Sequence, residues 1–200
     1  MKSVLSIVIF VMLVSTAWGQ FSGQLMPAGT VLKGSAEGGG YFGIYEDARG
    51  LVGSYRFGIS GYTDFGTRVG FIDFDAHGNN DTGLLLGGDI KYQVMEVRIM
   101  DPLDLSVGGI FETMLGIGNN SFSIGGYVTG SYPIELNSGR RIYPYGRMIF
   151  RMEWYDKTDS DFDPGLNLGA SMELNESTFV SAEIQFDDYF GLMIGLIFGF

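Results

Sequence analysis

The sequence predicts an all-β fold, an antiparallel up-and-down transmembrane β-barrel of about ten strands, with eight or twelve strands as the alternatives. Three observations predict it. Beyond residue 33, apolar and polar residues alternate with a period of two. Turn-forming clusters divide the chain into stretches of about ten to fifteen residues, which is the spacing of consecutive antiparallel strands. Within several stretches, charged residues occupy the face opposite to large apolar residues.

The last strand has the clearest pattern, because large apolar residues alternate with glycines at Gly191, Gly195 and Gly199. A strand of about eleven residues with one apolar face has the length that a tilted strand needs to cross a hydrocarbon layer. The expected strands in chain order are 35–46, 50–60, 65–75, 82–95, 103–116, 121–134, 141–155, 164–174, 177–187 and 189–200.

The charged face distinguishes a membrane barrel from a soluble one. In a soluble β-sandwich or lipocalin-like barrel, residues such as Arg147 and Arg151 would face solvent and the apolar face would point inward. In a membrane barrel the same residues would point into the lumen. The expected lumenal charges are Arg56, Arg68, Lys91, Arg147 and Arg151 against Asp89, Glu112, Glu153, Glu173 and Glu183.

Five positive and five negative charges in this set predict an internal ion-pair network, since buried charge is costly unless it is paired. They do not predict a selectivity ring of one sign. A barrel of eight to ten strands is largely filled by its own side chains, so we expect no wide aqueous channel.

The N-terminus has the pattern of a secretory signal peptide. Lys2 precedes an apolar run over residues 4–14, and Ala17-Trp18-Gly19 is a small-x-small cleavage pattern. That run is shorter than the ~20 residues needed for a transmembrane helix. We therefore expect a signal peptide over residues 1–19 and one barrel domain over residues 20–200.

Composition excludes several classes of function. The net charge of −11 excludes nucleic acid as a partner, because phosphate binding requires clustered Lys and Arg. The chain has no cysteine, so no disulfide stabilises it. Because no phosphate-binding glycine loop, metal cluster or redox motif is present, the sequence predicts no cofactor and no metal site.

Two polar loops are the candidates for chemistry at the end of the barrel opposite the termini, where we expect the longer loops. Residues 75–82 contain the only histidine, His77, two positions after Asp75. A lone loop histidine is usually a turn residue, so we predict no catalytic residue. Residues 156–163 resemble the start of a calcium loop, but Pro164 interrupts the pattern, and a solvated loop is favoured.

Aromatic residues concentrate near the expected strand ends, where a membrane barrel places its interfacial girdles. They are Tyr41, Tyr45, Tyr55, Tyr62, Tyr92, Tyr132, Trp154, Tyr155 and Tyr189.

The final eight residues, 193–200, resemble the C-terminal assembly signal of small bacterial outer-membrane β-barrel families. Gly195, Phe198 and Phe200 fit the signal, whereas Met193 replaces the usual polar residue at its start. The resemblance implies a bacterial outer-membrane location, termini in the periplasm and insertion by the outer-membrane assembly machinery. Outer-membrane lipid and lipopolysaccharide are then the expected surroundings.

The resemblance implies no particular activity, because these families include structural barrels, adhesins, channels and a few enzymes. We expect a structural or surface-interaction role without enzymatic activity. The alternatives are a narrow, porin-like channel for small solutes and an outer-leaflet hydrolase centred on His77.

Overall fold

The structure is a computed structural model and describes residues 25–46, 48–76, 79–116, 120–155, 158–186 and 190–200. The expected signal peptide and His77 lie outside these residues. In the part of the chain that the structure describes, no helix has the length and apolar character needed to cross a membrane.

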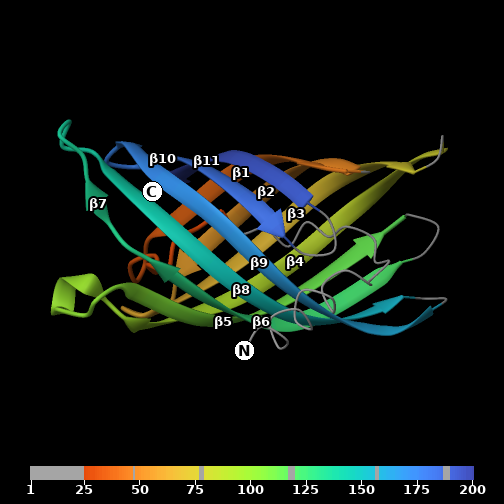
Figure 1. The fold of residues 1–200 in the computed structure, drawn as a ribbon, viewed down its shortest axis with the longest axis horizontal. Coiled ribbons are helices and arrows are strands. Elements are labelled where there is room, and N and C mark those ends of the chain that lie inside the picture. The colour runs from red at the N-terminus through yellow and green to blue at the C-terminus, as the bar shows by residue number, and fades with distance from the viewer. Residues whose placement is uncertain (1–24, 47, 77–78, 117–119, 156–157, 187–189) are drawn as a thin grey trace, which may run out of the picture.

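Almost all of the described chain is antiparallel β-structure (Figure 1). One short 3-10 helix, η1 (Val97–Ile99), interrupts it. The strands are β1 (Ala36–Tyr45), β2 (Ala48–Gly58), β3 (Thr63–Ala76), β4 (Asn79–Met95), β5 (Asp104–Leu115), β6 (Ser121–Ser131), β7 (Ile134–Glu135), β8 (Arg141–Tyr155), β9 (Thr158–Asn175), β10 (Thr178–Phe186) and β11 (Phe190–Gly199).

The strands close into a barrel. Consecutive long strands pair as hairpin neighbours, β6 pairs with β8, and β1 pairs with β11 over residues 37–45 and 191–199. The two-residue strand β7 pairs only with β8, so ten strands form the wall. This closed, antiparallel, ten-stranded barrel confirms the predicted fold class.

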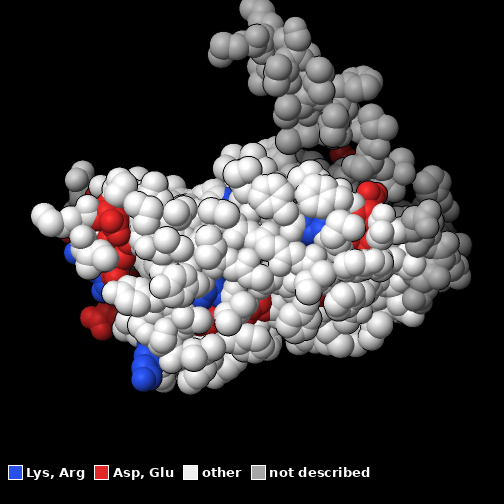
Figure 2. Space-filling model, turned by 90° about the horizontal axis from the view of Figure 1, so that it is seen from below, with Lys and Arg blue, Asp and Glu red and all other residues white. Residues whose placement is uncertain are grey.

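The wall has an apolar outside and a polar inside. Along β11, Leu192, Ile194 and Leu196 are 48%, 54% and 43% exposed, whereas Gly195 between them is buried. Most of the surface in Figure 2 carries no charge, and charged groups gather mainly toward the two ends. A soluble barrel would have the opposite arrangement, so the fold is that of a transmembrane β-barrel.

Gly195 lets two wall strands approach closely. A Cβ atom at this position would lie 2.4 Å from Cδ1 of Tyr41 and 2.7 Å from the carbonyl oxygen of Gly40, on the neighbouring strand. Real Cβ contacts are never so short, and only glycine leaves room for the inward ring of Tyr41.

Four strands, β2, β3, β4 and β9, begin earlier than the sequence predicts, and β4 and β9 differ most. β4 begins at residue 79 and β9 at residue 158, so most of the two expected outer loops is strand. Pro164 is tolerated within β9 because the pairing of β9 with β10 ends at Leu166. Pro164 is still in register with Phe150 of β8, so the strand is paired on one edge there and has no described pair on the other.

The expectation of longer loops at the end opposite the termini is wrong. Beside the termini, residues 96–103 and 132–140 form the long connections, and the latter includes β7. At the other end the strand bounds lie close together, since β3 ends at Ala76 and β4 begins at Asn79, and β8 ends at Tyr155 and β9 begins at Thr158. The ends of β3 and β4 lie at the right of Figure 1. Periodicity weakens near the tips of hairpins, which explains the error in the strand ends.

Candidate functional site in the barrel lumen

The wall directs most of the expected charges into the lumen. Arg56, Arg68, Asp89, Lys91, Glu112, Arg147, Arg151, Glu153 and Glu183 are each at most 7% exposed. Strict alternation along the strands produces this placement, because every second side chain of a barrel strand points inward.

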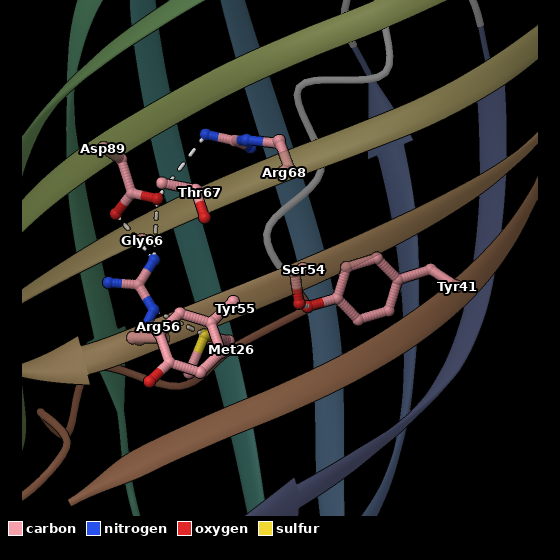
Figure 3. A pocket seen from close by; sticks show the side chains of 9 residues that line it. All are labelled: Met26, Tyr41, Ser54, Tyr55, Arg56, Gly66, Thr67, Arg68 and Asp89. Atoms are coloured by element: carbon pink, nitrogen blue, oxygen red, sulfur yellow. Dashed lines mark hydrogen bonds and ion pairs between the residues drawn. The ribbon is translucent and has the colours of Figure 1, made fainter.

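The first cluster of charges lies on β2, β3 and β4, and Figure 3 shows most of it. Arg56 forms an ion pair with Asp64 and a second one with Asp89, whose Oδ2 lies 2.6 Å from Nη2. Arg68 approaches the other oxygen of Asp89 at 3.5 Å, and Nζ of Lys91 lies 3.5 Å from Asp64. Three cations therefore share two carboxylates, so each charge has an opposite neighbour.

The second cluster surrounds Glu183 on β10. Its Oε2 accepts a hydrogen bond from the hydroxyl of Tyr145 at 2.8 Å. Its Oε1 accepts one from Asn167 at 2.8 Å and one from Gln185 at 2.6 Å. Arg147 lies 3.8 Å from Oε2. A carboxylate with this many donors is well compensated for burial.

The third cluster, nearer the end opposite the termini, is less completely paired. Arg151 forms an ion pair with Asp163. Glu112 is 4% exposed, and neither of its carboxylate oxygens has a hydrogen-bond partner among the described residues. One oxygen of Glu153 also lacks one there. Most buried polar groups in proteins form hydrogen bonds with protein or water. We therefore expect water molecules to hydrogen-bond to the carboxylates of this third cluster.

Glu173 does not join these clusters. Its Oε1 lies 2.9 Å from Nη2 of Arg141, whose side chain is 55% exposed, so the pair belongs to the rim beside the termini. Conversely, Asp64 and Asp163 are lumenal, although the sequence analysis placed them in turns. Each is separated by an even number of positions from an expected lumenal residue of its strand, Asp64 from Arg68 and Asp163 from Glu173, and this signal could have found them.

A segment that the sequence analysis did not identify enters the lumen. Residues 25–31 lie inside the wall, where Leu25 and Ala28 have no exposed surface and Val31 has 5%. The segment emerges at Leu32, which is 63% exposed, and turns into β1 through Gly34 at φ +81°. The chain therefore fills part of its own barrel.

Side chains of four strands hold the backbone of this segment. The N–H of Ala28 donates to Oγ of Ser131 at 3.0 Å, and that of Val31 donates to Asp64 at 2.9 Å. Lys91 donates to the carbonyl of Gly29 at 2.6 Å. Two further hydrogen bonds join the N–H of Thr30 to Gln93 and Arg147 to the carbonyl of Met26.

An apolar cluster fills another part of the lumen, along β1 to β5 and β11. It includes Leu25 and Met26 of the inserted segment and inward side chains of β1 to β5 and β11. Its wall members are Tyr41, Tyr45, Ala48, Val52, Ile72, Phe74, Leu85, Met114, Met193 and Ile197. Tyr41 and Tyr45 thus point inward and not, as expected, to a membrane girdle. Tyr55, Tyr62, Tyr92, Tyr132 and Trp154 are 42–52% exposed.

The residues of the expected assembly signal close the barrel. Phe198 and Phe200 are 48% and 71% exposed, and Phe200 lies against Tyr55 with ring centroids 6.2 Å apart. The backbone of Phe200 exchanges two hydrogen bonds of 2.9 Å with Ala36 at the start of β1. The C-terminal aromatic residue therefore anchors the closing strand pair.

The loops considered for chemistry provide no described site. His77 lies outside the described residues, and among the residues that are described no group of three or more acidic or histidine side chains could hold a metal ion.

No protein-family model and no curated protein matches the chain. Solved structures show general similarity. A structure described as de novo design of transmembrane β-barrels is 14% identical, with 86% of this chain and 99% of that chain covered and a TM-score of 0.42. The β domain of the Bordetella autotransporter BrkA is 11% identical, with 82% and 97% covered and a TM-score of 0.49. An outer membrane channel from Pseudomonas putida F1 is 11% identical, with 86% and 98% covered and a TM-score of 0.46.

These TM-scores are below 0.5, so the assignment rests on the strand pairing and burial of this chain. The closed ladder, the apolar exterior and the charged interior define a transmembrane β-barrel. Its lumen contains ion pairs, an apolar cluster and the chain's own residues 25–31.

Proposed function

We propose that this protein is an integral barrel of the bacterial outer membrane that contributes to envelope structure or surface interaction and has no enzymatic activity. Residues 1–19 are removed on export, both termini lie in the periplasm, and the outer-membrane assembly machinery inserts the barrel. The exposed apolar side chains of the wall support the membrane location, because they suit the acyl chains of outer-membrane lipid and lipopolysaccharide.

The observation that carries the structural role is the filled lumen. The inserted segment and the ion pairs of Arg56 and Glu183 occupy space that a general diffusion pore would leave to water. The hairpins β3–β4 and β8–β9 extend the wall away from the termini, and we propose that they provide the surface that meets partners outside the cell.

Fractionation combined with a heat-modifiability gel tests this proposal. We expect the protein only in outer-membrane fractions, with unboiled and boiled samples migrating differently, because a closed β-ladder resists detergent at room temperature. Purified protein in planar bilayers should show no large stepwise conductance. Recovery only in the soluble periplasm, without a gel shift, would overturn the membrane location.

The hydrolase alternative depends on His77. It requires that His77→Ala abolish hydrolysis of lipid or peptide substrates while the heat-modified gel shift persists. We expect neither the wild-type protein nor the variant to hydrolyse these substrates.

A further inference from the structure

The inserted segment lies between two parts of the lumen with different chemistry, the apolar cluster and the inner faces of β6, β8, β9 and β10, which are mainly polar apart from a small apolar group that Tyr127 and Ile149 form with Ile110 of β5. We propose that residues 25–31 form a displaceable plug, and that its withdrawal opens a hydrated route for small cations along these polar faces. This inference rests on the proposed membrane location and adds a conditional channel activity to it.

The plug is not part of the wall. Its lumenal hydrogen bonds come from side chains, whereas the wall is held by a closed ladder that runs from β1 to β11. Its bridge to a wall strand is Lys33 with Gly58, beside the hinge at Gly34. Withdrawal of the plug therefore leaves the strand pairs of the barrel intact.

The charged side chains that hold the plug also have partners in the wall. Lys91 faces Asp64 at 3.5 Å. Arg147, which donates to the Met26 carbonyl at 3.0 Å, also faces Glu183 at 3.8 Å. Because these ion pairs join wall residues, loss of the plug does not leave an isolated buried charge, which would strongly destabilise the barrel.

A polar surface continues beyond the plug. The buried inward residues of these strands include Ser123, Thr129, Glu153, Asp163, Asn167, Ser171 and Ser181. Several side-chain oxygens on this surface have no hydrogen-bond partner among the described residues. They are both carboxylate oxygens of Glu112 and one oxygen each of Glu153, Asp163 and Asn167. Such groups favour water over apolar surroundings, so the route lies along this side, past the small apolar group of Ile110, Tyr127 and Ile149, and avoids the larger apolar cluster.

The plug also borders a small cavity. It has a volume of about 20 Å³, room for about one water molecule, and its lining includes Met26 of the plug with Arg56, Arg68 and Asp89 of the wall (Figure 3). Arg56 Nε donates to the sulfur of Met26 at 3.0 Å. Polar wall groups therefore already lie behind the plug and would line the space that it leaves.

The charges along the route favour cations. In the third cluster, Arg151 is accompanied by three carboxylates, those of Glu112, Glu153 and Asp163, all at most 4% exposed. A passage lined by excess carboxylate concentrates cations and excludes anions. Glu112 is the residue to test, because its oxygens make no hydrogen bond that neutralisation would break.

The experiment uses the full-length protein in planar bilayers. Leu25→Glu places a carboxylate in the apolar cluster, where Leu25 has no exposed surface. We expect this substitution to expel the plug and raise the open probability about a hundredfold, since an unpaired buried charge is strongly disfavoured. The open state should be cation-selective, and Glu112→Gln in the Leu25→Glu background should shift the reversal potential toward that of anions.

The matched control is Asp73→Asn, which neutralises an outward carboxylate paired with Arg49. This substitution should leave the reversal potential unchanged.

A reversible lock completes the test. The chain has no native cysteine, and Ala28 N lies 3.0 Å from Ser131 Oγ, so Ala28→Cys with Ser131→Cys would tether the plug. Added to Leu25→Glu, the oxidised pair should abolish the openings and reduction should restore them. The plug proposal would be overturned if openings persist when mass spectrometry shows that the disulfide has formed. It would also be overturned if the reduced protein shows the gel shift of a folded barrel but never conducts. Absence of the gel shift in the wild-type protein would instead overturn the membrane barrel.

Discussion

The two sides of the lumen solve the same packing problem with opposite chemistry. Away from the buried charges of Arg56, Asp64 and Asp89, the inner faces of β1 to β4 and β11 carry residues such as Ile72, Leu85 and Met193, which pack without exposed surface, as in the core of a soluble protein. On the side of β8 to β10, Arg147 and Glu183 are equally buried but depend on ion pairs and hydrogen bonds. Apolar packing tolerates the absence of water, whereas the polar side keeps oxygens that require it.

The largest effect should come from a substitution that fills the space between β11 and β1 at Gly195. Gly195→Val places atoms within 2.4 Å of the Tyr41 ring and 2.7 Å of a backbone oxygen of β1, and backbone cannot move aside cheaply. We expect no closed barrel and no gel shift. Gly199→Ala should retain the shift, because a Cβ atom at this position would lie 3.8 Å from the carbonyl oxygen of Ser177. A folded Gly195→Val barrel would contradict this account of the contact.

Next in size is the loss of a buried charge from the polar side. Glu183→Ala removes the acceptor of Tyr145, Asn167 and Gln185 and leaves Arg147 without its carboxylate. We expect the free energy of unfolding to fall by about 3–5 kcal/mol, measured by urea titration in lipid vesicles. A change below about 1 kcal/mol would mean that water already compensates these groups.

The apolar side should respond less strongly to a comparable truncation. Leu85→Ala deletes part of a side chain with no exposed surface and leaves a cavity, so we expect a loss of about 3 kcal/mol in the same titration. Leu85→Met, which nearly conserves volume, should cost less than about 1.5 kcal/mol. Equal losses for the two variants would argue against tight packing on this side.

The smallest effect belongs to the outside of the barrel. Arg49 pairs with Asp73 at 2.8 Å, but its side chain is 65% exposed. Arg49→Ala should change the free energy of unfolding by less than about 1 kcal/mol, since exposed ion pairs contribute little. A loss as large as that of Glu183→Ala would erase the distinction between inner and outer charges.

Period-two alternation predicted the wall well. It identified the strand sequence, the outward apolar face of β11 and nine of the ten proposed lumenal charges as inward residues. It missed Asp64 and Asp163 because the expected strands began too late, at residues 65 and 164 where β3 and β9 begin at 63 and 158. It included Glu173 because parity alone does not reveal distance from the rim.

The plug could not be predicted in this way. Residues 25–31 have no strand period, and their partners, such as Ser131 and Arg147, lie 103 and 121 positions away in the sequence. The wall side chains bind backbone N–H and C=O groups of the plug, which nearly every residue type has. Such contacts between distant residues therefore leave no recognisable pattern in the sequence of the plug. Only the arrangement of the strands around the lumen brings these groups together.

The pairing of β1 with β11 also determines the order of events during assembly. Glu37 pairs with Gly199, so the barrel closes only after the last strand has formed. Closure brings together residues from the two ends of the barrel sequence, and such distant pairing is slow. Until then the nascent sheet has two open edges, which can template aggregation. A chain that ends before Phe190 would retain both edges permanently, and we expect periplasmic chaperones and proteases to meet it as a misfolded species.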